Sequence, residues 1–474
     1  MFSDPDRPEA IGSLGGDPCH RGFGTAGRIV SGAAQSPAAA TRSSIWTMGR
    51  RLDGGRAGDA DDKWFGMIRI GATAAVRMAF AVGIARIGGA EVFASFVALS
   101  AVEVVALTLL SAGWITPLCS LVPGAPAERR GALLDHALRR SVRAAAAAAV
   151  ILATATPIAV MTGGVDAALY LAFCASTGAW LTSSATTAAL ATRFANRRAL
   201  LATAASVPLP AVALAWAAGA GVAPLLPYFI AQTTAQIAAS AWMRRAIPRN
   251  AGPVDPAAID ALARHGRVVL VGSVANSLCT RVQPFVLAAV GGAAAVSGFG
   301  AANTLVGPAR VVSGAVGDVL RPRLALHQGP GGEPARGRRA LGLALAVLGS
   351  IAAVLVLASW FAGDAIGRLV FGPDFASLGR VLPWAAAFAG TASLANLLVV
   401  AMQSASLRGA RVASTTRTLV ALLSLAAVWP ACALDGARGA FVAMTFAEAL
   451  FLTRAAAFVA ATPLARAQPA VAVP

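Results

Sequence analysis

Charge is scarce in this 474-residue sequence, where Asp, Glu, Lys and Arg together make up 13% of the residues. Soluble globular proteins carry about 25% charged residues, so the chain lacks the polar surface that it would need in water. Instead, 57% of its residues are hydrophobic, and apolar runs recur that are long enough to cross a hydrocarbon core of about 30 Å as helices. These features exclude a soluble domain and predict an all-α polytopic membrane protein.

Lysine is almost absent as well. Lys63 is the only one, so arginine supplies nearly all of the positive charge behind the formal net charge of +18. In a soluble protein that excess would indicate nucleic-acid binding. Here the arginines fall in short loops between apolar runs, which is the usual signal of membrane topology. We therefore expect a lipid bilayer as a partner, and no nucleic acid.

Sequence motifs of catalysis and metal binding are missing too. The five cysteines are scattered without a CxxC pair, and the four histidines lie in the N-terminal tail or in loops. The chain has no Walker A, GxSxG or HExxH motif, and its loops are too short for an enzymatic domain. We expect no enzymatic activity, no catalytic residues, no metal, no cofactor and no disulfide.

Long apolar runs are what the sequence has in abundance. Twelve of them are candidate transmembrane spans, near residues 65–86, 91–118, 141–160, 167–191, 199–219, 223–243, 267–290, 294–318, 341–362, 380–402, 412–432 and 437–459. When the loops between them are divided into two alternating sets, one set holds nineteen arginines and the other only Arg86, Arg368 and Arg438. Arginine-rich loops stay on the cytoplasmic side, so we expect both termini in the cytoplasm.

A short repeat links the first and second parts of the chain. The stretch "GIARIGGAEVFASF" at 83–96 matches "AAVGGAAAVSGFG" at 288–300 when the two are aligned 203 positions apart. Each copy separates two apolar runs, which predicts tight outer turns between spans 1 and 2 and between spans 7 and 8. Six spans per copy make a parallel repeat about an axis along the membrane normal, a design that encloses a site between two rocking halves.

The repeat predicts a domain organisation. We expect a disordered tail over 1–62 in which Met48 is an alternative start, six-helix halves over 63–245 and 266–460, a cytoplasmic linker over 246–265 and a cytoplasmic tail over 461–474.

Charged residues inside the spans are candidate functional residues, because each costs at least about 2.5–3.5 kcal/mol at mid-membrane. In the first span Arg69, Thr73 and Arg77 share one helix face. An offset of 204 places Arg77 over Arg281 in the seventh span. Two arginines that face each other form a natural site for phosphate oxygens, which guanidinium groups bind in pairs. For Arg69, snorkelling to lipid headgroups is an equal alternative.

Other polar residues extend this hypothesis. Asn303 and Arg310 share a face of the eighth span, and we place both in the same cavity. Glu103, Glu448 and Asp318 are candidates for ion coupling or for charge pairing with an intramembrane arginine.

Several stretches resemble the polysaccharide transporters. They are "RIGGAEVFASFVALSAVEVVALTLLSAG" at 86–113, "PGAPAERRGALLDHALRRS" at 123–141, "SLCTRVQPFVLAAVGGAAAVSGFGAANTLVGPARVVSGAVGDVLRPRLA" at 277–325 and "RLVFGPDFASLGRVLPWAAAFAG" at 368–390. The resemblance implies a Wzx-type flippase of the multidrug/oligosaccharidyl-lipid/polysaccharide exporter superfamily, with a MATE-like fold of about 12 helices. Such a protein moves undecaprenyl-diphosphate-linked oligosaccharide across a bacterial inner membrane for exopolysaccharide, capsule or O-antigen (lipopolysaccharide) synthesis, beside polymerases and glycosyltransferases. It implies an anion-binding role for Arg77, Arg281 and Arg310.

Four other interpretations compete with this one. A cation-coupled multidrug exporter of the same fold would have a more acidic and aromatic cavity, whereas only 6% of these residues are aromatic. A lipid II flippase would need two further helices, and a major-facilitator transporter would need a signature that loop 2–3 lacks. A membrane scaffold of a polysaccharide synthesis complex would have no need of buried arginines.

Overall fold

The computed structural model describes residues 57–111, 127–157, 166–191, 195–247, 256–328, 334–405 and 407–461. The chain divides into two compact units, Met1–Gly55 and Arg56–Pro474, and all of the described residues belong to the second. Most of the predicted tail 1–62 with its alternative start at Met48, and the tail 461–474 beyond its first residue, lie outside the described residues.

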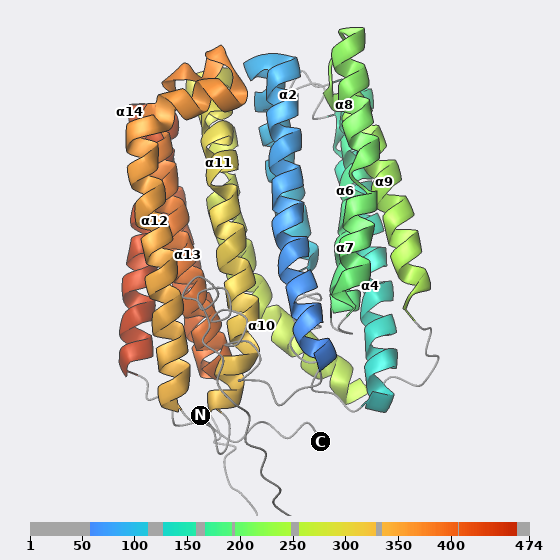
Figure 1. Cartoon of the computed structure of the whole chain (residues 1–474), viewed down its shortest axis with the longest axis vertical. Helices are drawn as coiled ribbons and strands as arrows, with labels where there is room; N and C mark the ends of the chain where they lie inside the picture. Colours follow the sequence, from blue (N-terminus) through green and yellow to red (C-terminus); the bar gives the residue numbers. More distant parts are fainter. Residues whose placement is uncertain are drawn as a thin grey trace, which may run out of the picture. The chain divides into compact units, whose positions relative to one another are not determined.

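The described residues are almost entirely helical, as the sequence predicts (Figure 1). The helices are α2 (Ala57–Ser111), α4 (Ala127–Thr154), α6 (Ala167–Ala191), α7 (Asn196–Ala205), α8 (Pro208–Ala220), α9 (Leu225–Arg245), α10 (Pro256–Arg281), α11 (Gln283–Gln328), α12 (Pro334–Phe371), the 3₁₀ helix η2 (Pro373–Arg380), α13 (Leu382–Ala405) and α14 (Leu407–Ala461). Each of the twelve predicted spans overlaps one of them. Within the described residues, six helical stretches are long and apolar enough to cross a membrane: Phe65–Leu109, Asn196–Ala220, Leu270–Gly317, Ala335–Phe371, Leu382–Gln403 and Gly409–Ala461.

Three of these stretches are hairpins of two spans each. In α2, Phe80 and Phe96 both pack on the ring of Tyr228, with ring centroids 5.6 and 6.0 Å from it, so the chain folds back between them. In α14, Arg417 and Glu448 form an ion pair although they are 31 residues apart. The bend in α11 lies at Gly292. Each long stretch therefore accounts for two predicted spans.

The repeated glycines make the two predicted turns. Gly89 has φ 72° and ψ −172°, and Gly292 has φ 65° and ψ −165°, a region of backbone space that is open essentially to glycine alone. The glycines just before them, Gly88 and Gly291, each leave room for the side chain four residues further along the chain. A Cβ on Gly88 would lie 2.6 Å from Val92, and one on Gly291 would lie 2.7 Å from Ala295. The sequence repeat is thus a repeat of backbone geometry.

Two predicted spans are interrupted. The span at 199–219 is broken between α7 and α8, where Pro208 lies in the first turn of α8 and cannot continue the preceding helix. The span at 267–290 is broken at Val282, between α10 and α11. Pro284 has no N–H to donate to the preceding turn, and the side chain of Gln283 instead donates to the carbonyl of Cys279.

Two element boundaries also differ from expectation. The helix α2 begins at Ala57, inside the predicted tail, and α10 begins at Pro256, inside the predicted linker. Pro256 starts α10 without cost, because the first helical position needs no N–H donor.

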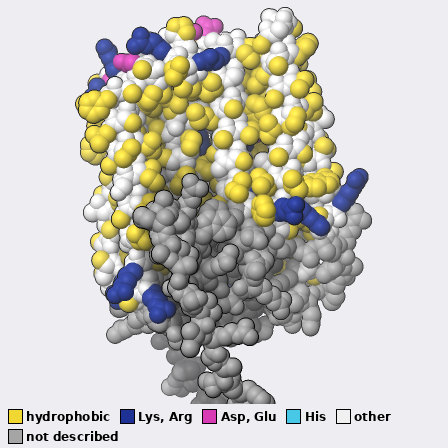
Figure 2. All heavy atoms as spheres, viewed as in Figure 1, with side chains coloured by type: hydrophobic (Ala, Val, Ile, Leu, Met, Phe, Trp, Pro, Cys, Tyr) yellow, Lys and Arg dark blue, Asp and Glu magenta, His cyan; other side chains and the backbone are white. Residues whose placement is uncertain are grey.

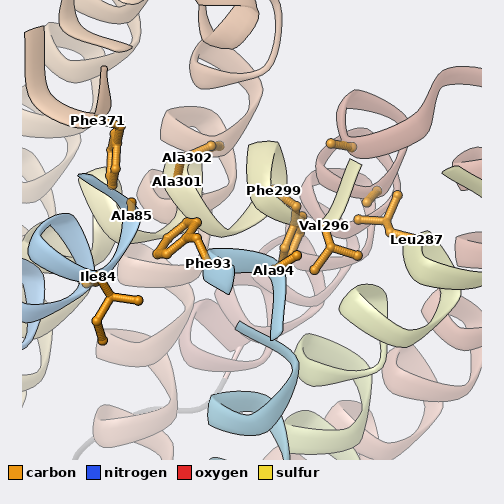
Figure 3. Packing of buried hydrophobic residues seen from close by; sticks show 14 of the residues in the cluster. Ile84, Ala85, Phe93, Ala94, Leu287, Val296, Phe299, Ala301, Ala302 and Phe371 are labelled. Atoms are coloured by element: carbon orange, nitrogen blue, oxygen red, sulfur yellow. The ribbon is translucent and has the colours of Figure 1, made fainter. Parts of the chain in front are cut away.

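Within the unit Arg56–Pro474, α2 contacts helices that precede residue 245 and helices that follow it. It packs against α4, α6, α7 and α8, and also against α10 and α11, which in turn contact α13 and α14. The largest buried cluster lies between these helices and includes Phe93, Phe299 and Phe371 (Figure 3). Its small members Ala301 and Ala302 are fully buried, which lets α2 and α11 approach closely.

The outer surface is apolar, as a bilayer requires. Figure 2 shows hydrophobic side chains over most of the described part of this face, with arginines toward its two ends. Phe361 and Leu434 are 84% and 88% exposed. Large apolar side chains at such exposure would be costly in water, so the finding supports a multi-pass membrane protein.

Candidate functional site

Arg77, Glu103 and Arg281 lie at a similar depth below the two glycine turns. Arg77 precedes Gly89 by twelve residues, Glu103 follows it by fourteen, and Arg281 precedes Gly292 by eleven. At 1.5 Å per helical residue, these separations correspond to depths of about 16–21 Å. Arg77, on the hairpin of α2, and Arg281, at the α10–α11 break, therefore lie at a similar level of the structure.

A hydrogen bond fixes the register between α2 and α10. The hydroxyl oxygens of Thr108 and Ser277 are 2.7 Å apart. Side chains four residues apart share a helix face, so one turn further toward the glycine turns Arg281 comes beside the 103–104 segment of α2. The positive charges of Arg77 and Arg281 both act on the Glu103 carboxylate.

Buried polar atoms in this cluster lack partners. Glu103 is 9% exposed, and neither its Oε1 atom nor Nε of Arg281 has a hydrogen-bond partner among the described residues. A buried polar atom without a partner costs about 1–3 kcal/mol, and more when it is charged. Glu103 Oε1 can therefore still accept a hydrogen bond, and Arg281 Nε can still donate one.

Arg281 lies at the very end of α10. The carbonyl groups of the last helical turn carry a partial negative charge, which favours a cation there. The break at Val282 thus supports a half-buried guanidinium that also lies within the fields of Arg77 and Arg310. Broken helices of this kind are tolerated in membranes where neighbouring helices or a cavity cover the irregular backbone.

Arg77 is held differently, by an aromatic ring. Its Cζ atom lies 4.1 Å from the ring centroid of Trp180, on α6. Such a cation–π contact is worth about 0.5–2 kcal/mol, depending on exposure to water. The threonines near Trp180 on α6 bond their own backbone, as Thr177 does to Phe173 and Thr182 to Gly178. Trp180 is therefore the residue of α6 that contacts Arg77, and the sequence analysis does not predict it.

Asn303 and Arg310 come together on α11 as the sequence predicts. Arg310 donates to the side-chain oxygen of Asn303 at 2.6 Å, and its Cζ lies 5.6 Å from the ring centroid of Phe388. The charge of Arg310 acts on Arg281. The three predicted arginines Arg77, Arg281 and Arg310 therefore follow one another across α2, α10 and α11.

Glu448 forms a bidentate ion pair with an arginine of its own hairpin. Arg417 Nη1 donates to Oε1 and Oε2 of Glu448 at 2.6 and 2.5 Å, and its Cζ lies 3.9 Å from the ring centroid of Phe451. A cavity of about 10 Å³, the size of one water molecule, borders the pair. Of the two roles expected for Glu448, the structure displays charge pairing. Arg417 was missed, although an arginine inside the predicted span 412–432 was a usable signal.

Two predicted site residues are left, Arg69 and Asp318. Arg69 lies two turns nearer the start of α2 than Arg77, and its backbone carbonyl accepts a hydrogen bond from Thr73. The side chain of Asp318 is outside the described residues. Among the side chains that the structure describes, no three of His, Cys, Asp or Glu lie close enough together to hold a metal ion.

No family model and no curated protein sequence matches the chain. Solved structures do. The chain resembles the lipid II flippase MurJ in an inward closed conformation, with a TM-score of 0.67 at 13% identity over 85% of this chain and 88% of that one. It also resembles an inward-facing multidrug resistance MATE family transporter of the MOP superfamily, with a TM-score of 0.60 at 14% identity over 81% and 94% of the two chains.

A third similar structure is a MOP superfamily transporter from Pyrococcus furiosus, described as having a binding pocket of reverse polarity. Its TM-score is 0.59 at 14% identity over 85% of this chain and 96% of that one. At these identities the comparisons establish the fold, and they confirm the predicted MATE-like helical architecture. These three neighbours are two transporters and a flippase.

Proposed function

We propose that the protein flips undecaprenyl-diphosphate-linked oligosaccharide across the bacterial inner membrane by alternating access, for exopolysaccharide, capsule or O-antigen synthesis. The observation that carries the proposal is the succession of Arg77, Arg281 and Arg310 on three neighbouring helices, within membrane-spanning segments where a charge is expensive. An anionic group that enters the membrane interior needs such compensation, and guanidinium groups bind phosphate oxygens bidentately. The fold shared with a lipid II flippase supports the proposal.

Alternating access also requires two parts that move about a common site. In the proposed arrangement, 63–245 and 266–460 are pseudo-symmetric halves joined by the cytoplasmic segment 246–265, with both termini in the cytoplasm. The nearly equal backbone angles at Gly89 and Gly292 support the pseudo-symmetry. The uneven distribution of loop arginines supports the orientation. Polymerases and glycosyltransferases are the partners that this function implies.

The test is flipping of a fluorescent polyprenyl-diphosphate oligosaccharide in proteoliposomes. We expect transport by the wild type and at least roughly tenfold slower transport by Arg77→Ala and Arg281→Ala, since each removes a charge-assisted phosphate contact. The matched control is Arg438→Ala, because Arg438 is half exposed and pairs with Asp435 at the bend of α14. Transport that survives both site substitutions would refute the assignment of the arginines.

A second candidate is a cation-coupled multidrug exporter. The observation in its favour is Glu103, a buried carboxylate with an unpaired oxygen close to Tyr228, since carboxylate and aromatic groups bind organic cations. Transport of a cationic dye under an ion gradient, without flipping of any diphosphate lipid, would favour this function.

A further inference from the structure

Glu103 places a negative charge inside the proposed diphosphate site. A site built only to attract anions would exclude carboxylates, because like charges repel at close range. Glu103 instead lies next to Val104, which is one helical turn from Thr108 and so comes beside Arg281 in the register that the Thr108–Ser277 contact sets, and both Arg77 and Arg281 act on Glu103. Its burial at 9% exposure and its unpaired Oε1 show that it does not simply form a closed ion pair.

The charges around the site sum to a small positive number. Arg77, Arg281 and Arg310 contribute three positive charges, and Glu103 removes one. Arg417 and Glu448 neutralise each other in their bidentate pair. Tyr228 of α9, which also faces Glu103 and Arg77, is an uncharged phenol, so the site carries a net charge of about +2 with Glu103 ionised.

The two diphosphates that such a protein meets differ in charge. A diphosphate esterified at both ends, as in a lipid-linked glycan, has one ionised oxygen on each phosphorus and carries two negative charges. A polyprenyl diphosphate without its glycan has a terminal phosphate, which loses a second proton near pH 6 and then carries a third negative charge. The charge of the site matches the first ligand and not the second.

We propose that Glu103 is a specificity-determining residue, which uses its charge to favour glycan-bearing diphosphate diesters over free polyprenyl diphosphate. This inference rests on the proposed function of the arginine cluster. Arginine does not lose its proton in proteins, so the ionised form of Glu103 is what limits the positive charge of the site to two. The third negative charge of the free diphosphate then lies near the Glu103 carboxylate without a cation of its own.

The test compares two probes on purified, detergent-solubilised protein: farnesyl diphosphate and its glucosyl diester, titrated by calorimetry at pH 6 and pH 8. For the wild type, we expect the preference for the diester to grow roughly tenfold or more between the two pH values, as the terminal phosphate gains its charge beside Glu103. Glu103→Gln is expected to bind free diphosphate more tightly than the wild type does at pH 8, and its preference for the diester is not expected to grow between pH 6 and pH 8. Glu103→Asp is expected to keep the growth seen in the wild type.

Control variants separate this inference from the proposed function. Glu91→Gln makes the same chemical change at an exposed position on the same arm of α2, and we expect it to match the wild type. If Arg281→Ala binds both probes as well as the wild type does, the proposed diphosphate site is wrong. If Arg281→Ala loses binding while Glu103→Gln keeps the wild-type preference at both pH values, only the role of Glu103 is wrong.

A second substitution covers the case in which Glu103→Gln does not fold. Arg310→Gln lowers the net charge of the site instead of raising it, so it is expected to weaken binding of both probes and to widen the preference for the diester at pH 8. A preference that stays equal to that of the wild type would overturn the proposal.

Discussion

From the ion pair between Arg417 and Glu448 we predict that removing either partner alone destabilises the protein. Their side chains are 14% and 8% exposed, and two short hydrogen bonds join them. Removing one partner of a buried pair typically costs about 3–5 kcal/mol, because the other charge stays buried without compensation. We therefore expect Arg417→Met to lower the free energy of unfolding by this amount, a value that also includes the lost contact with Phe451.

The assay is thermal unfolding in detergent, followed by intrinsic fluorescence. Replacing both partners, in Arg417→Met/Glu448→Leu, is expected to restore most of the lost stability, since apolar residues of similar volume often replace a buried pair at little cost. The matched control is Arg438→Met. Arg438 and Asp435 are 3.2 Å apart and about half exposed, so this change is expected to cost no more than about 1 kcal/mol. If the double variant is as unstable as Arg417→Met, packing rather than charge explains the effect, and the reasoning is refuted.

Three further predictions follow from backbone and packing. Gly89→Ala is expected to destabilise the protein by about 1–3 kcal/mol through its positive φ, whereas Gly71→Ala, with open space around it, should be neutral or slightly stabilising in a thermal melt. A Cβ on Gly300 would overlap Val97, so Gly300→Ala should lower the melting temperature and Val97→Ala should rescue it in the double variant. Arg86 donates to two carbonyls at the end of α12, and Arg86→Gln is expected to cost about 1 kcal/mol in the same assay, since the group is exposed.

The positions of the helices and of the two glycine turns were readable from the sequence. Hydrophobic length predicts a span because the bilayer sets the length of a helix. The turns were readable because glycine is nearly the only residue that adopts the angles found at Gly89 and Gly292. The break at Val282 was missed, although Pro284 marks it. Proline is tolerated inside membrane helices, so its presence alone does not predict a break.

The sequence predicts contacts within the site only where the residues lie on one helix or on two helices that the repeat relates. Asn303 and Arg310 are two turns apart on α11, and their hydrogen bond follows from helical spacing. The contact between Arg77 and Trp180 joins helices about 100 residues apart, and no local pattern encodes such an approach. The relation of Glu103 to Arg281 depends on the register between α2 and α10, which one hydrogen bond reveals and which periodicity alone leaves open.

The repeat also explains why Arg281 and Arg417 should respond to substitution in opposite ways. Arg417 has one acidic partner and holds it in a closed pair. Arg281 lies within the fields of Arg77 and Arg310 and of a single acid, Glu103, so duplication has placed like charges together. Like charges that lie close together destabilise the protein unless a ligand compensates for them, and functional sites commonly trade stability for function in this way. We therefore expect Arg281→Met to raise the melting temperature or leave it unchanged, and to weaken diphosphate binding. If this variant lowers the melting temperature as much as Arg417→Met does, Arg281 is a structural residue and the anion site must be sought elsewhere.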